Sequence, residues 1–168
     1  MLNKKICLLG SLAVGKTSLI RRFVSSIFSD DYLSTVGVKI SKKVLVMDGQ
    51  EINLLLWDLE GQDEYDEVSV SYLKGAAGLL FVIDGTRGPT LVQALEIRES
   101  GLKVAGPDTP HLFLVNKSDL REEWQVGEAV LGALRDKGYE VLEVSAKTGE
   151  NVEKAFELLT RLMLEKDR

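Results

Sequence analysis

The sequence predicts an α/β fold in which a mostly parallel sheet carries helices on both faces. Short apolar runs alternate with segments of helical period along the 168 residues, as in chains built from strand–helix–strand units. Two of the runs, AAGLLFVID and HLFLVN, are continuously apolar, which is typical of strands covered on both faces. The pair Asp48-Gly49 separates two further apolar runs and is a strong signal for a hairpin. We therefore expect one antiparallel edge strand in an otherwise parallel sheet.

Six segments are predicted as strands and four as helices. The strands are expected at residues 5–10, 38–47, 51–58, 76–84, 111–116 and 140–145. The helices are expected at residues 16–24, 90–104, 124–138 and 151–164, where apolar residues recur near helical spacing. Gly138 fits the C-terminal cap of the third helix. Residues 28–37 are polar and acidic and are expected to form a loop.

The length suits one domain that spans residues 1–168. The net charge is −5, so the composition does not favour nucleic-acid binding. The one cysteine, Cys7, lies in an apolar run and is expected to be buried in a strand. No apolar stretch approaches the length of a membrane span, and neither end carries a lipid-anchor motif. These features indicate a cytoplasmic protein that reaches membranes, if at all, through a partner.

The segment Gly10 to Ser18, GSLAVGKTS, matches G-x-x-x-x-G-K-[ST] between a predicted strand and a predicted helix. In this context the backbone N–H groups of the loop wrap a phosphate, aided by the positive end of the helix dipole. Lys16 is expected to reach the β- and γ-phosphates, and the Thr17 hydroxyl to ligate Mg²⁺. The other interpretation, an ordinary glycine-containing turn, is disfavoured because the pattern arises by chance in only about 1% of such chains.

A second loop begins at Asp58, where an apolar run ends. A carboxylate in that place can hold Mg²⁺, usually through water. Three residues on, Gly61 could bring a backbone N–H close to a γ-phosphate. The D-x-x-G pattern is weak alone, because it usually marks a turn, but it becomes strong beside a phosphate loop.

The third and fourth loops are NKSD, Asn116 to Asp119, and SAK, Ser145 to Lys147. Asp119 can accept hydrogen bonds from N1–H and the exocyclic amine of guanine, whereas adenine presents no such donor pair. A surface turn is the alternative for NKSD, since Asn, Ser and Asp favour turns. The tripeptide SAK alone does not indicate a binding site. Its position after the last predicted strand, beside the other three loops, is what makes it a candidate.

In this order and spacing the four loops resemble those of the Ras-like small GTPases over essentially the whole chain. The resemblance implies a P-loop NTPase fold with six strands and five helices, with GTP or GDP and Mg²⁺ as ligands. It implies catalytic roles for Gln62, Lys16 and Thr35. It implies metal binding by Thr17, Thr35 and Asp58. The nucleotide-binding residues that it implies are Ala13, Val14, Gly15, Lys16, Thr17, Ser18, Phe28, Thr35, Gly61, Asn116, Lys117, Asp119, Ser145, Ala146 and Lys147.

Within the superfamily, STVGVKI is most similar to the Rab and Ras branches, and the stretch between Asp119 and Ser145 is too short for the extra helix of the Rho branch. Most Rab and Ras members carry a C-terminal cysteine that this sequence lacks. Prokaryotic relatives often lack such a tail, so a prokaryotic Rab-like protein is one option. Two residues depart from the family pattern. Glu60 replaces the small alanine of DTAGQE, and Leu12 stands where many Ras members have glycine, with bulk that impedes a partner's arginine in the family.

The leading hypothesis is a GTP-hydrolysing switch whose loops around Thr35 and Gln62 order when GTP binds and contact effector, activating and exchange proteins. No Arg lies between Phe23 and Asp58, so no switch residue there can act as an internal arginine finger. Slow intrinsic turnover, accelerated by a partner, is therefore expected.

Two other functions stay open. The first is a nucleotide-loaded scaffold with negligible hydrolysis, suggested by Leu12 and Glu60. A carboxylate about 4 Å from a phosphate charge is repelled by ~1 kcal/mol in water and ~4 kcal/mol at an effective dielectric of 20. Glu60 has no such effect if it points to solvent. The second is a P-loop kinase, for which neither an arginine-rich lid nor an acceptor site is apparent.

Three aromatic residues allow a structural interpretation. Phe28 would stack on the base, although a core aromatic has the same sequence signature. His111 opens a predicted strand with no acidic or Cys neighbour, so a structural role is favoured. Trp57 suits either the core or a partner-binding surface.

Overall fold

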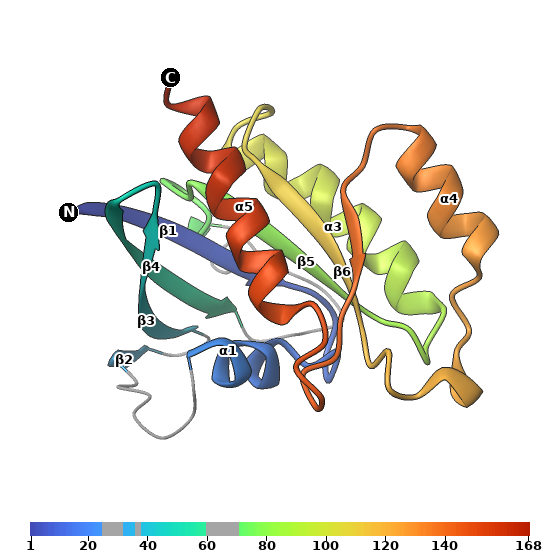
Figure 1. Cartoon of the computed structure of the whole chain (residues 1–168). Helices are drawn as coiled ribbons and strands as arrows, with labels where there is room; N and C mark the ends of the chain where they lie inside the picture. Colours follow the sequence, from blue (N-terminus) through green and yellow to red (C-terminus); the bar gives the residue numbers. More distant parts are fainter. Residues whose placement is uncertain (25–31, 36–37, 60–70) are drawn as a thin grey trace.

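The computed structural model describes residues 1–24, 32–35, 38–59 and 71–168, and for residues 32–35 it describes the backbone alone. A twisted central sheet carries helices on both of its faces (Figure 1). The α/β architecture predicted from the alternation of strands and helices is confirmed.

In the part of the chain that the structure describes, the sheet has seven strands in the order β2-β3-β4-β1-β5-β6-β7. The strands are β1 (Leu2–Leu9), β2 (Tyr32–Thr35), β3 (Val38–Met47), β4 (Gln50–Leu59), β5 (Gly78–Asp84), β6 (His111–Asn116) and β7 (Val141–Glu143). β4, β1, β5, β6 and β7 run parallel, whereas β3 pairs antiparallel with β4 and with β2. All six predicted strands are present, and the mostly parallel sheet with an antiparallel hairpin strand is confirmed. That strand, β3, was predicted at the edge of the sheet but lies second from it, because β2 pairs with it on the outside.

β2 is a further strand that pattern analysis did not find. The prediction of a loop over residues 28–37 is wrong for Tyr32–Thr35, which pair with the start of β3. Four mostly polar residues carry no signal of period two, so their extended form depends on the open edge that β3 offers. The remaining residues of that segment, 28–31 and 36–37, lie outside the described residues.

The hairpin between β3 and β4 turns at Asp48 and Gly49, with φ of 51° and 76°. A two-residue turn with positive φ at both positions is the type I′ turn that Asp-Gly favours. The register that follows from it pairs Met47 with Gln50 at the turn and Lys39 with Asp58 at the far end. The hairpin thus delivers Asp58 to the edge of the sheet where the loops after the parallel strands gather.

Four α-helices occur among the described residues, so the fifth of the five expected helices is not among them. They are α1 (Lys16–Val24), α3 (Pro89–Ala105), α4 (Glu128–Asp136) and α5 (Val152–Lys166). α4 begins at Glu128 and not at residue 124 as predicted. The reason is tertiary: Gln125 N donates to the Gly85 carbonyl at 2.7 Å, which holds the preceding segment against the loop after β5. No helix in the described part of the chain is long and apolar enough to cross a membrane.

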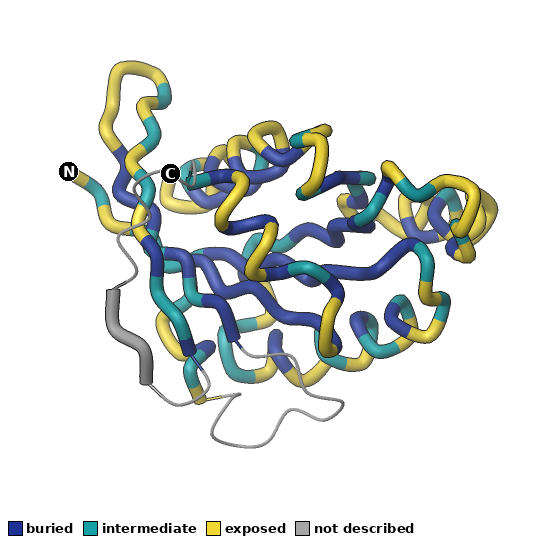
Figure 2. The backbone as a smooth tube through the Cα atoms, turned by 90° about the horizontal axis from the view of Figure 1, so that it is seen from below, coloured by how far each residue is buried: buried dark blue, intermediate teal, exposed yellow. Residues whose placement is uncertain are grey.

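Each face of the sheet has its own core, and β1 serves both. Ile6 and Leu8 pack into the cluster that contains α1 and α5, whereas Cys7 and Leu9 pack into the one that contains α3 and α4. Buried residues run along the strands between the two helical layers (Figure 2). Cys7 is buried in its strand as predicted, and burial raises the pKa of its thiol to about 12. The sheet is therefore a rigid support for the loops at its edge.

Candidate functional site

A groove runs across the loops that follow the parallel strands. It consists of two adjoining hollows of about 510 and 430 Å³. The first is lined by Leu12, Ala13, Gly15, Lys16, Thr17, Ser18, Asp58 and Lys117, and the second by Gly15, Ser18, Asn116, Lys117, Asp119, Leu120, Ala146 and Lys147. Gly15, Ser18 and Lys117 line both, so the hollows are continuous. This is the edge at which open α/β sheets bind ligands.

Lys16 is the first residue of α1, and its side chain folds back over the loop that precedes the helix. Its Nζ lies 3.1 Å from the Gly10 carbonyl oxygen and 3.4 Å from that of Ser11. The residue is only 6% exposed, yet it lines the first hollow. Its ammonium and the N-terminal end of α1 therefore make this hollow attractive to an anion.

Two glycines let the loop pass close to the strands beside it. A Cβ at Gly10 would lie 2.6 Å from the Val82 carbonyl oxygen, which is backbone and cannot yield. Gly15 has φ of 103°, and a Cβ there would lie 2.2 Å from Asn116 Nδ2. The packing thus requires glycine at both motif positions, and the positive φ is a second reason for glycine at position 15.

Side chains from elsewhere in the chain donate hydrogen bonds to three successive carbonyl groups of the loop between β1 and α1. Arg87 Nη2 donates to Leu12 (2.6 Å), Lys117 Nζ to Ala13 (3.2 Å) and Asn116 Nδ2 to Val14 (2.9 Å). The loop after β6 is thereby attached to the loop after β1. Sequence analysis placed both loops at one site but predicted no contact between them.

Thr17 and Asp58, the two predicted metal ligands with described side chains, are in direct contact. Thr17 Oγ1 donates to Asp58 Oδ2 at 2.5 Å. No group of three or more His, Cys, Asp or Glu that could hold a metal ion occurs in the described part of the chain. A hydroxyl and one carboxylate are the sparse oxygen donors suited to Mg²⁺, which keeps most of its water and binds substrate phosphates. The residues present therefore fit Mg²⁺.

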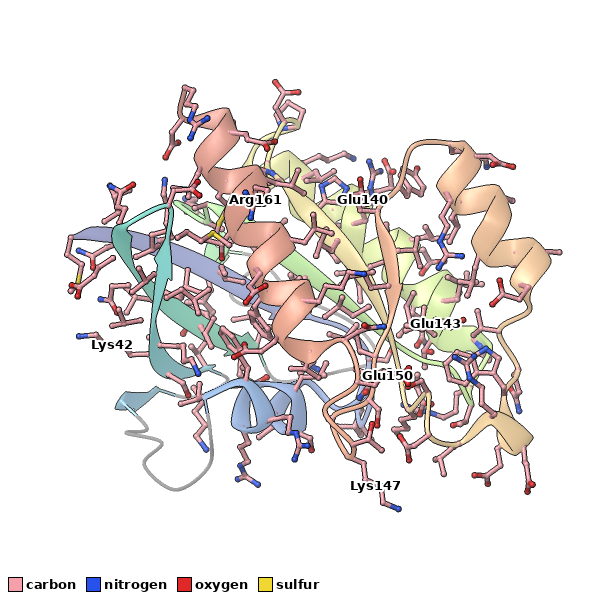
Figure 3. The ribbon with its side chains drawn as sticks, viewed as in Figure 1. Lys42, Glu140, Glu143, Lys147, Glu150 and Arg161 are labelled. Atoms are coloured by element: carbon pink, nitrogen blue, oxygen red, sulfur yellow. The ribbon has the colours of Figure 1, made fainter. Side chains whose placement is uncertain are left out.

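The second hollow is lined by Asp119, the predicted guanine acceptor. Ser145 Oγ donates to Asp119 Oδ1 at 2.6 Å, and the Ala146 N–H donates to Asn116 Oδ1 at 3.1 Å. Thr148 N donates in turn to Ser145 Oγ at 3.1 Å. Lys147, at the tip of the loop after β7, points away from the protein body (Figure 3). NKSD and SAK are thus joined by side-chain hydrogen bonds that orient the Asp119 carboxylate.

Asp84, at the end of β5, is a site-supporting residue that sequence analysis missed. Its side chain is 1% exposed and binds Lys117 Nζ at 2.8 Å and Arg87 Nε at 3.0 Å. Burial raises the pKa of Asp84, but hydrogen bonds from Lys117, Thr86 and Arg87 outweigh this effect, so the pKa of the carboxyl lies below its ordinary value. Its position in the sequence could have identified it, because Asp84, like Asp58, is an acid at the end of an apolar run.

Several predicted site residues cannot be placed in the groove. Phe28, Glu60, Gly61 and Gln62 lie outside the described residues. Thr35 belongs to β2, of which only the backbone is described. The other predicted residues line the groove or bond to its walls.

His111 and Trp57 have structural surroundings. The ring of His111 packs edge-on against both Phe81 and Phe113, with centroid distances of 5.7 and 6.3 Å, as the structural interpretation predicts. Trp57 is half-buried beside Tyr72 and lies under Lys5 Nζ, 3.8 Å from its ring centroid. Trp57 therefore belongs to the rim of the core.

The fold and the groove together define the P-loop class of nucleotide-binding proteins. The Ras family model matches residues 5–165, and the chain belongs to the Ras family. Proteins of this family bind GTP and GDP, typically with Mg²⁺, and act as small GTPase switches.

Individual relatives place the chain near the Rab branch, as the resemblance predicted. It is 32% identical to Ras-related protein Rab-8B of Homo sapiens over 163 residues, 96% of this chain and 79% of that protein. It is 32% identical to Ras-related protein Rab-13 of Canis lupus familiaris over 161 residues, 95% and 79% of the two chains. It is 33% identical to Ras-related protein Rab-4 of Dictyostelium discoideum over 165 residues, 96% and 80%.

Proposed function

We propose that residues 1–168 form a single G domain that binds GTP and GDP with Mg²⁺ and hydrolyses GTP slowly. One observation carries this proposal: the anion-attracting hollow at Lys16 continues directly into the hollow at Asp119. A groove with that layout suits a ligand with phosphates at one end and guanine at the other.

In this proposal the base end selects guanine. Asp119, oriented by Ser145, accepts from N1–H and the exocyclic amine, and the Ala146 N–H meets the guanine oxygen. Asn116 and Lys117 connect this end to the phosphate loop. Adenine would leave the Asp119 carboxylate without these two donors, which weakens its binding relative to guanine.

At the phosphate end, the loop amides and Lys16 neutralise the charge that develops on the phosphates. Thr17 and Asp58, with Thr35, would hold Mg²⁺. This ion, when bound, supplies further positive charge at the phosphates. Gln62 orients the attacking water.

Hydrolysis is slow in this proposal because, without a partner's arginine, part of the negative charge of the transition state is left without a stabilising cation. A partner that supplies an arginine would neutralise this charge and accelerate turnover. Leu12 is 62% exposed and lines the phosphate hollow, where bulk would obstruct such an arginine, so it counts for the second candidate below. Effector, activating and exchange proteins would bind the loops around Thr35 and Gln62. We place the protein in the cytoplasm, with a partner as one route to membranes, and expect no nucleic-acid ligand.

Nucleotide binding to the purified chain tests this function. We expect GDP and GTP to bind at least ~10³-fold more tightly than ATP, and single-turnover hydrolysis on the order of 10⁻⁴–10⁻³ s⁻¹ with Mg²⁺. Asp119→Ala should abolish the preference for guanine, whereas Glu122→Ala, the removal of a nearby exposed carboxylate, should keep it. ATP binding with comparable affinity would overturn the proposal.

A loaded scaffold with negligible hydrolysis is the second candidate, favoured by the exposed Leu12 at the phosphate end. Single-turnover hydrolysis of Glu60→Ala and Leu12→Gly separates the two. Faster turnover in either variant supports suppression by that residue. Rates and affinities equal to those of the wild type would show that neither residue suppresses hydrolysis.

A further inference from the structure

Three successive peptide groups of the phosphate loop have their carbonyl oxygens bound on one side. A trans peptide group directs its C=O and its N–H in opposite directions. The donors to residues 12, 13 and 14 therefore direct the N–H groups of residues 13, 14 and 15 away from themselves. Asn116 and Lys117 orient two of these amides, and Arg87 orients the third, that of Ala13.

The peptide that Arg87 holds is one that needs support. Ala13 has φ of 64°, in the left-handed region that residues with a Cβ rarely adopt. Without an external donor, the Leu12–Ala13 peptide could relax to an ordinary conformation and turn its N–H elsewhere. The hydrogen bond from Arg87 Nη2 to the Leu12 carbonyl, at 2.6 Å, opposes that rotation.

Arg87 is itself fixed by a buried carboxylate. Its Nε lies 3.0 Å from Asp84 Oδ2, and the Asp84 side chain is 1% exposed. The same oxygen accepts from Lys117 Nζ at 2.8 Å. One carboxylate thus anchors two cations, and these cations bind two adjacent carbonyls of the loop.

The held amide lies at one particular end of the groove. Leu12 and Ala13 line the hollow that contains Thr17 and Asp58, and they do not line the one that contains Asp119. The Ala13 N–H is therefore at the end away from the base, where the terminal phosphates of a nucleotide would lie.

We propose that Arg87 is a positioning residue that aims the Ala13 N–H at the terminal part of a bound triphosphate. This role rests on the proposed binding of guanine nucleotides. Because the contact is made at the far end of the phosphate chain, Arg87 favours GTP over GDP. A planar guanidinium can reach both Asp84 and Leu12, whereas a lysine ammonium is a point donor that cannot keep both geometries.

Equilibrium affinities for GDP and for a non-hydrolysable GTP analogue test this role. For Arg87→Gln we expect affinity for the GTP analogue to fall about tenfold, as for the loss of one charge-assisted hydrogen bond, and affinity for GDP to fall by less than about threefold. Arg87→Lys keeps the charge beside Asp84 and should give an intermediate ratio, and it serves if the glutamine variant does not fold.

Arg135→Gln is the matched control. Arg135 is exposed to a similar extent and likewise joins a carboxylate, Glu128, to a backbone carbonyl, that of Val141. It should leave the ratio of the two affinities unchanged. A ratio unaltered in both Arg87 variants, with normal wild-type binding, overturns the role of Arg87 alone. A wild-type chain that binds neither nucleotide overturns the proposed function as well.

Discussion

Lys117 Nζ and Asp84 Oδ2 form an ion pair of 2.8 Å between the ends of two neighbouring parallel strands. β5 and β6 are paired in register through Asp84 and Asn116, so Lys117 follows directly beyond the last pair. The sheet thereby places a buried carboxylate beside Lys117 of NKSD, the predicted guanine-reading motif. Because Lys117 also donates to the Ala13 carbonyl, this ion pair connects the sheet and NKSD with the loop after β1.

Replacing that carboxylate should weaken the site and the fold together. Asp84→Asn leaves Lys117 and Arg87 without their anionic partner, and we expect the free energy of unfolding to fall by about 1–3 kcal/mol. GDP affinity should fall by about tenfold to a hundredfold, because the carbonyls of the phosphate loop lose fixed donors. Urea unfolding and GDP titration measure the two effects. Glu99→Gln, which removes the exposed partner of Arg98, should change neither by more than about 0.5 kcal/mol.

Gly15→Ala should be among the most damaging single-methyl substitutions in this chain. The residue has φ of 103°, and the added Cβ would lie 2.2 Å from Asn116 Nδ2. We expect a loss of roughly 1–3 kcal/mol of stability from backbone strain, together with a loss of GDP binding as Asn116 is displaced. Differential scanning calorimetry and GDP titration record both.

The control for that substitution lies in α4. Gly132 is inside the helix, and among the described residues no atom outside its own helical backbone and chain neighbours lies within 4 Å of a Cβ built there. Gly132→Ala should therefore stabilise the protein by about 0.5–1 kcal/mol through helix propensity. Equal effects of the two glycine substitutions would contradict the packing argument for Gly15.

His111 should make the stability depend on pH in one window. Arg98 Nε donates to its Nε2 at 3.0 Å, so its Nδ1–H donates to the Thr109 carbonyl at 2.8 Å. Burial and the positive charge of Arg98 lower the pKa of His111 below the ordinary 6.5, although the Thr109 carbonyl opposes this shift. Below pH 6.5 the unfolded chain takes up the proton first. The stabilisation is therefore complete above that pH and is lost as the pH falls towards the folded-state pKa.

This dependence can be isolated because His111 is the only histidine. The free energy of unfolding, measured in urea between pH 5 and 8, should decline on acidification more steeply for the wild type than for His111→Gln. The histidine ring signal in NMR should titrate at a pH below 6.5. Parallel stability curves for the two proteins would disprove the assignment.

Much of the fold follows from local pattern. The Asp48-Gly49 pair specifies its turn because only such residues accept positive φ at both positions. β6 and α1 have the predicted bounds, His111–Asn116 and Lys16–Val24, because their apolar periodicity begins and ends sharply. β2 and the late start of α4 could not be found in this way, since each depends on a partner distant in the sequence: the edge of β3 and the carbonyl of Gly85.

The candidate site likewise has a part that local sequence patterns predict and a part that they do not. Lys16, Thr17, Asp58, Asn116 and Asp119 could be predicted as site residues because binding of phosphate, Mg²⁺ and guanine each requires particular residue types at fixed spacing. Their meeting at one edge also follows, because the carboxyl ends of parallel strands lie together.

The supporting network around these residues is a property of the folded chain alone. Asp84 and Arg87 belong to no motif, and their contacts with Lys117 and Leu12 join residues 33 and 75 positions apart. A sequence motif identifies the residues that contact a ligand. Which groups hold them in place depends on side chains brought together by the packing of β1, β5 and β6, and that packing is decided by the whole hydrophobic core.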